Sequence, residues 1–505
     1  MKTITIDGSS MTLSDVRAAA FREVKFQLSD DARRRMKASR LLVEEITAKG
    51  SQVYGITTGF GVFSDVAISP DKTRELQRNL VLSHCAGVGD PYSIETSRAM
   101  MILRANALAK GYSGIRPEIV DLLVMLHRED IVPIIPSQGS VGASGDLAPL
   151  AHLASVLIGE GTVWRRGKKV GAMVALEAAR VSPVTLEAKE GLALINGTQA
   201  ITAQGGLALH KASTLLDLAD LVGAMSLDAL LGTDAAFDER VHLARPHAGQ
   251  LHVAAHLRGL LEGSGLRESH RDCERVQDAY SLRCMPQVHG AVRDAVMFAT
   301  ATIEIEINSA TDNPLIFAEE HAVISGGNFH GAPAALACDI AAIALTDLAS
   351  ISERRIERLV NPQLSNGLPA FLVRDGGLNS GFMIAQVTAA ALVSECRAFA
   401  HPASVDSIPT SANKEDHVSM GPIASMKLAR VVENVAAVLA IEAICAAQAI
   451  ELRRPVTSSP RIEKAFDVIR TRVPFWESDR YLHADLTAAI ELLPALHKLM
   501  TSRGF

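Results

Sequence analysis

The chain has 505 residues, 48% of them hydrophobic, and a formal net charge of -6 at pH 7. This hydrophobic content excludes a disordered chain, and the negative charge gives no basic footprint for nucleic acid. Single hydrophobic cores rarely grow so large, so we expect at least two regions. Aromatic residues make up only 4% while alanine and leucine abound, which favours closely packed helices.

The cysteine spacing predicts neither a zinc site nor a disulfide framework, because no Cys-x-x-Cys pair occurs among the six cysteines. We therefore expect a reducing compartment, the cytoplasm. Residues 1–8 alternate like a short strand and lack the apolar core of a signal peptide. The most apolar run, Val435 to Ile450, is interrupted by Glu442 and Gln448, so we expect a buried core helix and no membrane span.

A glycine-punctuated loop follows the charged helices expected up to about residue 50. It reads Tyr-Gly-Ile-Thr-Thr-Gly-Phe-Gly over residues 54–61. Tyr54 is either a packed ring in an ordinary turn or a candidate proton carrier. Residues 69–71, Ser-Pro-Asp, then begin a helix that runs towards Ser83 and His84. A lone histidine at a helix end more commonly caps carbonyl groups.

The most unusual stretch covers residues 139–150, Gly-Ser-Val-Gly-Ala-Ser-Gly-Asp-Leu-Ala-Pro-Leu. A helical pattern over about 95–128 and an extended segment over 131–136 precede it. Three small residues, Ala143, Ser144 and Gly145, leave the backbone free to bend back on itself. The Gly145 nitrogen can then attack the Ala143 carbonyl carbon. Loss of water closes an imidazolone ring, and loss of the Ser144 hydroxyl leaves an electrophilic exocyclic methylene.

Three other interpretations fit this loop less well. A glycine-rich loop entering a helix is the simplest, and Ala-Ser-Gly alone is a weak signal. A nucleophile elbow needs Gly-x-Ser-x-Gly, but Asp146 stands where the final glycine belongs. A phosphate-binding loop needs lysine followed by serine or threonine at its end, and no lysine follows.

Long helices are expected to dominate the rest of the chain. Residues 160–185 are mixed and polar, which predicts a hairpin-like segment, and Asn196 before Gly197 is typical of a turn. Helical patterns then cover about 198–231, 285–310, 333–360, 380–400 and 422–453. The last would be ~45 Å long at ~1.5 Å per residue. Such long helices with few aromatics indicate a bundle and oligomerisation.

Polar clusters punctuate these helices. Gln277, Tyr280 and Arg283 are spaced by three, so in a helix they would share one face. The planar fork of arginine suits a carboxylate, and Tyr280 is a second candidate proton carrier, although a surface ion-pair face would show the same pattern. The other clusters are expected as a turn, a loop and a charged loop: 311–315, 326–331 and 411–420.

Residues 139–152, Gly-Ser-Val-Gly-Ala-Ser-Gly-Asp-Leu-Ala-Pro-Leu-Ala-His, resemble the signature of the aromatic amino acid and histidine ammonia-lyase family. The resemblance extends from Tyr54 to about Pro455. It implies a mainly α, fumarase/aspartase-like fold, with a long central helix bundle and a smaller mixed N-terminal region that carries the prosthetic-group loop. We expect residues 1–200 to form that region and residues 201–505 the bundle.

The resemblance also implies that Ala143-Ser144-Gly145 cyclises on its own to 4-methylideneimidazole-5-one, with no external cofactor and no metal. Two tyrosines match acid–base groups of the family, Tyr54 and Tyr280. Five side chains are expected to bind a small amino-acid substrate: His84, Asn196, Arg283, Asn313 and Glu415. Of these, three match groups that fix its carboxylate: Asn196, Arg283 and Asn313. Three others are expected to support the prosthetic group: Asp146, Gln277 and Phe329. Relatives are homotetramers with shared active sites.

The substrate preference depends on two positions. The family's histidine enzymes have Ser-His at 83–84 and an acid at 415, whereas phenylalanine-type relatives have Phe-Leu and tyrosine-type relatives His-Leu at 83–84, and both have glutamine at 415. Lys414 departs from the glutamine usual in histidine enzymes, and a cation there favours ionised Glu415. We expect conversion of L-histidine to trans-urocanate and ammonia. The alternatives are the same scaffold acting on L-tyrosine or L-phenylalanine, an aminomutase, or a non-enzymatic helical scaffold.

Overall fold

The computed structural model describes residues 2–59, 61–63, 66–273 and 275–501. Phe60 of the loop 54–61, called the tyrosine loop from here on, therefore lies outside the described residues. The chain forms two compact units, each built from three segments. Unit 1 contains Met1–His210, Ala299–Asp339 and Pro402–Met426; unit 2 contains Lys211–Phe298, Ile340–His401 and Lys427–Phe505. The units therefore interleave along the chain, and the expected division after residue 200 stays a prediction.

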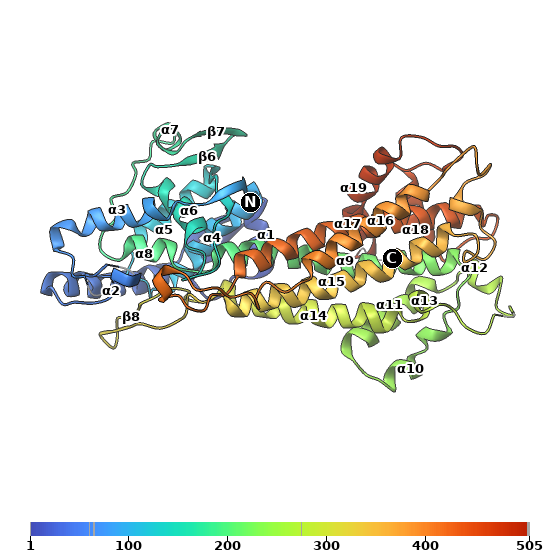
Figure 1. Cartoon of the computed structure of the whole chain (residues 1–505), viewed down its shortest axis with the longest axis horizontal. Coiled ribbons are helices and arrows are strands. Elements are labelled where there is room, and N and C mark those ends of the chain that lie inside the picture. Colours follow the sequence, from blue (N-terminus) through green and yellow to red (C-terminus); the bar gives the residue numbers. More distant parts are fainter. Residues whose placement is uncertain (1, 60, 64–65, 274, 502–505) are drawn as a thin grey trace. The chain divides into compact units, whose positions relative to one another are not determined.

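The fold is mainly α, as the sequence predicts, with nineteen α-helices among the described residues. The five long helical patterns are confirmed to within a few residues. They are α9 (Gln199–Ala229), α14 (Met285–Ile307), α15 (Ala332–Val360), α16 (Met383–Phe399) and α17 (Gly421–Leu452). In unit 2, α9, α15, α16 and α17 run along a common direction (Figure 1).

Unit 1 holds eight shorter helices whose ends follow local sequence signals. They are α1 (Leu13–Ala20), α2 (Asp30–Lys49), α3 (Thr73–His84), α4 (Ile94–Ala109), α5 (Pro117–Arg128), α6 (Ala148–Leu157), α7 (Ala172–Ala178) and α8 (Glu190–Ile195). The single pattern expected over 95–128 is wrong, because the chain breaks between α4 and α5. Gly111 and Gly114 both have positive φ there, and Pro117 holds Arg116 extended before the first turn of α5.

Every strand in the described residues belongs to unit 1. The strands are β1 (Thr3–Ile6), β2 (Lys25–Leu28), β3 (Val88–Pro91), β4 (Ile131–Pro133), β5 (Pro136–Gln138), β6 (Thr162–Arg165), β7 (Lys168–Gly171), β8 (Leu315–Phe317) and β9 (Ala322–Ile324). β1 pairs with β2 in parallel, whereas the pairs β3–β5, β4–β6, β6–β7 and β8–β9 are antiparallel. The expected N-terminal strand and the expected hairpin are therefore confirmed as β1 and β6–β7.

Unit 2 is a helical bundle in which a buried ion pair and its hydrogen bonds link α9, α15 and α17. Its shorter helices are α10 (Glu239–Leu243), α11 (Ala248–Leu261), α12 (Gly265–Glu268), α13 (Tyr280–Arg283), α18 (Pro460–Arg470) and α19 (Leu482–Met500). Glu442 of α17 accepts hydrogen bonds from Ser226 of α9 at 2.7 Å and Ser352 of α15 at 2.6 Å. Arg355 of α15 pairs with the same carboxylate at 2.5 Å, and both side chains are fully buried.

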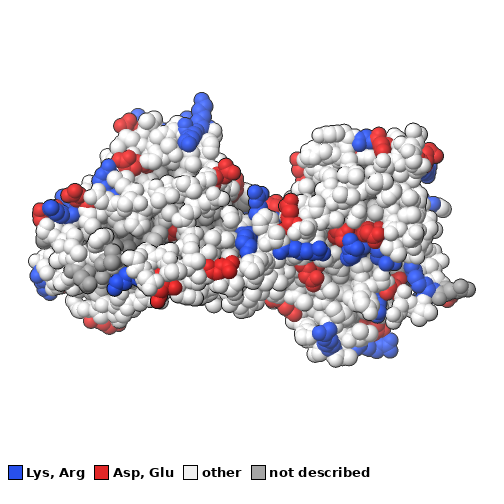
Figure 2. All heavy atoms as spheres, viewed as in Figure 1, with Lys and Arg blue, Asp and Glu red and all other residues white. Residues whose placement is uncertain are grey.

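The two most apolar helices are core helices. By length and composition alone, α15 and α17 could each cross a membrane, but 67% and 83% of their apolar windows are buried inside the protein. Val435 and Ile450 are both fully buried, as expected for this run. On the face shown in Figure 2, basic side chains are interspersed with acidic ones, so this face has no block of single-sign charge.

Five short 3-10 helices complete the described elements. One lies at the C-terminal end of the tyrosine loop, one directly precedes α3, one lies before α10, and two lie in loops after α15 and α16. They are η1 (Gly61–Phe63), η2 (Pro70–Lys72), η3 (Ala235–Phe237), η4 (Ala370–Leu372) and η5 (Ser411–Asn413).

Candidate active site

The Ala-Ser-Gly loop lies in unit 1 between β5 and α6 and is sharply bent. Ala143 and Ser144 form a turn, and Gly142, Ser144 and Gly145 have φ values of 77°, 52° and 79°. Gly145 pairs with Gly197 in a parallel bridge. A Cβ at position 145 would lie 2.2 Å from the Gly197 carbonyl oxygen, so glycine is required there. The tripeptide is therefore held in a bent backbone conformation.

The loop 411–420 holds the other side of this turn. Met420 donates its N–H to the Val141 carbonyl at 2.8 Å, and the Ser419 hydroxyl donates to the Gly142 carbonyl at 3.4 Å. A Cβ at position 142 would lie 2.1 Å from Ser419 Oγ. The two loops are therefore in backbone contact, although Gly142 and Ser419 lie 277 positions apart in the sequence.

Glu415 meets the central serine of the tripeptide. Ser144 Oγ donates to Glu415 Oε1 at 3.0 Å. The other carboxylate oxygen accepts from Thr410 Oγ1 at 2.9 Å and from Ser411 Oγ. Lys414 is exposed and forms no ion pair among the described residues, so hydroxyl groups and not this lysine hold the carboxylate.

Tyr54 shares the electrostatic surroundings of Glu415. Burial raises the pKa of its phenol, the negative charge of Glu415 raises it further, and a hydrogen bond to the Gly61 backbone lowers it. The loop itself is fixed by hydroxyls, since Thr57 Oγ1 donates to the Ser51 carbonyl at 2.6 Å. In the free chain, Tyr54 is therefore a neutral phenol at neutral pH, placed near the acid that contacts Ser144.

Asp146, the residue after the tripeptide, is fully buried at the start of α9. Its carboxylate accepts the backbone N–H of Ala200 at 2.5 Å and of Ile201 at 3.3 Å. Its own N–H donates to the Gly197 carbonyl at 2.6 Å. Burial is the largest influence on its pKa and raises it to about 7, against the effect of these two N–H groups. Asp146 thus ties the C-terminal side of the tripeptide to α9.

A buried polar cluster lies beside this bridge and contains residues that the sequence analysis did not single out. Asn196 Nδ2 donates to Asp312 Oδ1 at 3.2 Å and to the Asn313 carbonyl at 3.1 Å. Lys189, which is fully buried, pairs with Asp312 Oδ2 at 2.8 Å. Arg104 is also fully buried and donates to Gln199 Oε1 at 2.5 Å. The sequence signal available for Lys189 was its position as a charged residue close to the apolar run 191–195. Its partner Asp312 lies 123 positions away in the sequence.

Three candidate residues belong to unit 2. Helix α13 covers only residues 280–283, and Gln277 lies in the non-helical segment before it, so the condition for a shared helical face is not met at Gln277. The Arg283 guanidinium lies 4.6 Å from the centre of the Tyr280 ring, a cation–π contact. Tyr280 is 71% exposed. Arg355 donates to the Ser281 carbonyl at 3.4 Å, which links this turn to the buried bundle charges.

His84 and Phe329 make no described contact with Ser144 or Glu415. His84 Nδ1 lies 2.8 Å from the Leu80 carbonyl oxygen and 3.1 Å from Ser83 Oγ, as expected for a ring at a helix end. Phe329 is half-buried in the loop 326–331. The next residue, His330, stacks on His417 with ring centres 5.9 Å apart, so this loop contacts the 411–420 loop.

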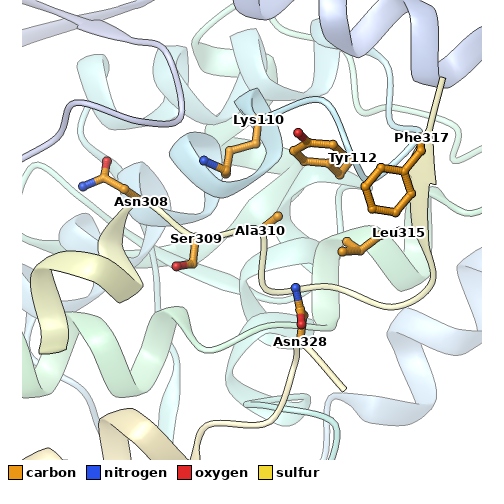
Figure 3. Close-up of a pocket in the computed structure, with 8 residues that line it drawn as sticks. All are labelled: Lys110, Tyr112, Asn308, Ser309, Ala310, Leu315, Phe317 and Asn328. Atoms are coloured by element: carbon orange, nitrogen blue, oxygen red, sulfur yellow. The ribbon is translucent and has the colours of Figure 1, made fainter. Parts of the chain in front are cut away.

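A surface pocket of about 360 Å³ in unit 1 contains none of the predicted site residues (Figure 3). Its lining includes Lys110, Tyr112 and Asn328, and the rings of Tyr112 and Phe317 lie 5.4 Å apart. Lys110 Nζ donates to the Gly8 carbonyl at 3.1 Å, so this lysine already has a partner. The pocket is distinct from the cluster around Ser144.

Known proteins resemble this chain over its whole length. The sequence pattern of the family described as aromatic amino acid lyase matches residues 11–471. A histidine ammonia-lyase of Koribacter versatilis (strain Ellin345) is 55% identical over 98% of this chain and 98% of that protein. The crystal structure of histidine ammonia-lyase from Trypanosoma cruzi matches with a TM-score of 0.92 at 45% identity, covering 99% of this chain and 95% of that chain.

The structure of tyrosine aminomutase from Streptomyces globisporus matches with a TM-score of 0.93 at 40% identity, covering 99% of this chain and 98% of that chain. With a mainly helical fold and a bent Ala-Ser-Gly loop beside an acid and a tyrosine, the protein is a carbon–nitrogen lyase. The chain belongs to the aromatic amino acid lyase family, as the resemblance of its motifs predicted.

Proposed function

We propose that this protein eliminates ammonia from L-histidine to give trans-urocanate. The observation that carries the proposal is the hydrogen bond from Ser144, in the bent tripeptide, to Glu415, with Tyr54 in the same electrostatic surroundings. This hydrogen bond joins the Ala-Ser-Gly loop to Glu415, the acid that by resemblance is expected to bind the imidazole ring of the substrate. The 55% identity to a histidine ammonia-lyase supports the same substrate.

We infer that Ala143-Ser144-Gly145 forms 4-methylideneimidazole-5-one. Closure joins the Gly145 nitrogen to the Ala143 carbonyl carbon with loss of one water, and the second water takes the Ser144 hydroxyl and its α-hydrogen. The left-handed turn and the absence of room for a Cβ at position 145 fit this reaction. The group supplies an electrophilic carbon to which a substrate amine adds. Asp146 holds the loop at α9, and by resemblance Gln277 and Phe329 complete its support.

Tyr54 is the proposed base for the β-hydrogen, with Tyr280 assisting. Its pKa is raised in the free protein, so the phenol needs a positive charge nearby to lose its proton more readily. The ammonium of a bound amino acid supplies such a charge. A positioned acid–base group of this kind typically contributes ~10²–10⁴-fold in rate.

The remaining residues would bind the two ends of the substrate. Arg283 suits the carboxylate through its planar fork, and Asn196 and Asn313 are the other candidates for the amino-acid end. His84 and Glu415 would orient the imidazole through its two nitrogens. A phenyl ring would leave both of these side chains without partners in a dry pocket, at ~1–3 kcal/mol for each group.

We propose a cytoplasmic homotetramer with shared active sites. Large apolar side chains are exposed on three long helices: Met297 and Ile305 on α14, Leu336 and Ile343 on α15, and Ile384 and Val387 on α16. Exposed apolar faces of this kind mark protein–protein contacts. All six cysteines are free thiols, which fits a reducing compartment.

The test compares purified protein on L-histidine, L-tyrosine and L-phenylalanine, following formation of the conjugated acid. Histidine is expected to be used best by a wide margin. Glu415→Gln should reduce histidine turnover sharply, and His84→Leu should mainly raise KM for histidine. Higher turnover of tyrosine or phenylalanine would contradict the proposal, and accumulation of a β-amino acid would show an aminomutase.

A further inference from the structure

The side-chain amide of Asn196 is held in one orientation by its neighbours. Its Nδ2 lies 3.2 Å from Asp312 Oδ1 and 3.1 Å from the Asn313 carbonyl oxygen. Both neighbours can only accept hydrogen bonds, whereas an amide has one accepting and one donating end. A rotated amide would face two oxygen atoms with its own oxygen, so the orientation is chemically determined.

This orientation leaves the carbonyl oxygen of Asn196 as the end of the amide that lacks a hydrogen-bond partner. The residue is 3% exposed, and its Oδ1 has no hydrogen-bond donor among the described residues. Asn196 precedes Gly197, which pairs with Gly145 of the reactive loop. An amide oxygen accepts from N–H or O–H groups and cannot bond a carboxylate oxygen. Asn196 therefore suits the amino group of a substrate better than its carboxylate.

Lys189 and Asp312 fix this orientation. Lys189 Nζ lies 2.8 Å from Asp312 Oδ2, and both side chains are almost completely buried. The other oxygen of Asp312 accepts from the Asn313 backbone N–H at 2.7 Å as well as from Asn196. Both carboxylate oxygens are thus engaged, so Asp312 presents an accepting oxygen to Asn196 in a fixed place.

The neighbouring amide is held in the opposite sense. Asn313 Oδ1 accepts from the Gly326 N–H at 2.7 Å and from Ser325 Oγ at 3.3 Å. Its Nδ2 is consequently the end left to donate. Asn196 and Asn313, which are neighbours in space, therefore offer one acceptor and one donor. This pair matches the ammonium and the carboxylate of an α-amino acid.

We propose that Lys189 and Asp312 are positioning residues that hold Asn196 with its carbonyl oxygen towards the substrate amino group, while Asn313 donates to the carboxylate. The inference rests on the proposed function and deepens it, since it assigns the amino end of the substrate to Asn196. The pair acts only through Asn196 and touches no reacting atom.

The test uses two ligands that each carry one end of the substrate. Histamine has the amine without the carboxylate, and 3-(imidazol-4-yl)propanoate has the carboxylate without the amine. Their affinities are measured by titration calorimetry in a Ser144→Ala background, where the amine cannot react with the prosthetic group. Inhibition constants are then measured in the background with intact Ser144.

Asn196→Ala removes the acceptor, and Asp312→Asn lets the Asn196 amide turn round. Each is expected to weaken histamine binding about tenfold or more, the usual scale for a lost hydrogen bond to a charged group, and to change propanoate binding less than about twofold. Glu306→Gln is the control, because this half-buried acid in unit 1 accepts a hydrogen bond from Thr198 Oγ1 at 2.5 Å and has no described contact with Asn196. It should leave the ratio of the two affinities unchanged.

Weaker propanoate binding with unchanged histamine binding would overturn the assignment, as would equal losses for both ligands. If Asp312→Asn does not fold, Asn196→Ala decides the amide assignment on its own. Turnover of the three amino acids by the protein with intact Ser144 tests the proposed function separately. If another amino acid is preferred, its amine and acid analogues replace the two ligands.

Discussion

Replacement of Asp146 by asparagine is expected to make the stability of this protein less dependent on pH. Asp146 is fully buried, and burial raises its pKa from 3.8 to about 7, against the effect of the Ala200 and Ile201 N–H groups. The folded chain therefore binds this proton more tightly than the unfolded chain. Between these two pKa values stability falls as the pH rises, because the unfolded state has already lost the proton.

The size of the effect follows from the two pKa values. A shift from 3.8 to about 7 corresponds to about 4 kcal/mol once the group is ionised in both states. By linkage, the raised pKa of Asp146 lowers the free energy of unfolding of the parent by about 2 kcal/mol near pH 5 and by about 4 kcal/mol near pH 8. Asparagine does not titrate. The free energy of unfolding of Asp146→Asn, relative to that of the parent, should therefore rise by about 2–3 kcal/mol from pH 5 to pH 8. Any loss of hydrogen bonding in the variant is the same at both and cancels.

Unfolding midpoints of parent and variant near pH 5 and pH 8 measure this difference. Both chains carry Ser144→Ala, so that formation of the proposed prosthetic group cannot differ between them. Asp479→Asn is the matched control, because Asp479 also accepts two consecutive backbone N–H groups, from Ser380 at 2.7 Å and Gly381 at 2.9 Å.

Asp479 is exposed, and these bonds lower its pKa, so it is ionised at both pH values. Its variant should show no pH-dependent difference. If the difference in stability between Asp146→Asn and the parent is also the same at both pH values, the reasoning is refuted. It would mean that the two N–H groups at the start of α9 outweigh burial.

Three further outcomes are expected. The intact mass should be two waters below the encoded mass, with the loss confined to the peptide containing Ser144; active protein of full encoded mass would contradict this. Tyr54→Phe should reduce turnover ~10²-fold or more with the fold retained; unchanged turnover would leave Tyr54 as a packed ring and Tyr280 as the leading base. Glu442→Gln should lower the free energy of unfolding by ~3–5 kcal/mol, because it leaves Arg355 buried without its counter-charge. Adding Arg355→Met should recover part of that loss in denaturant unfolding.

The long helices could be predicted from the sequence because their apolar residues recur over many turns. The break between α4 and α5 was missed because the apolar pattern resumes after it. The structure shows the break in the positive φ values of Gly111 and Gly114 and in the extended Arg116 before Pro117. For Gln277 the spacing left the local structure open. Regular spacing of three is compatible with a helix but does not require one, and α13 begins only at Tyr280.

Parts of the candidate site could not be found in this way. Resemblance named Ser144 and Glu415, and the structure places them in contact. Lys189 and Asp312 carried no such signal, because each is an ordinary charged residue in the sequence and the two lie 123 positions apart. Their pairing beside Asn196 can be seen only in the folded structure, because the segment after α14 brings Asp312 next to Lys189.

The same buried contacts would favour the ring closure proposed for the tripeptide. Ser144 and Leu147 adopt positive φ values of 52° and 46°, which side chains other than glycine rarely do, and each costs ~1–3 kcal/mol. Such residues persist only where their surroundings determine the backbone. Here the bridge of Gly145 to Gly197 and the bonds of Asp146 to α9 do so. If the proposed cyclisation occurs, the conformational entropy of bending is lost in folding, before the covalent step, and this would lower the barrier of that step.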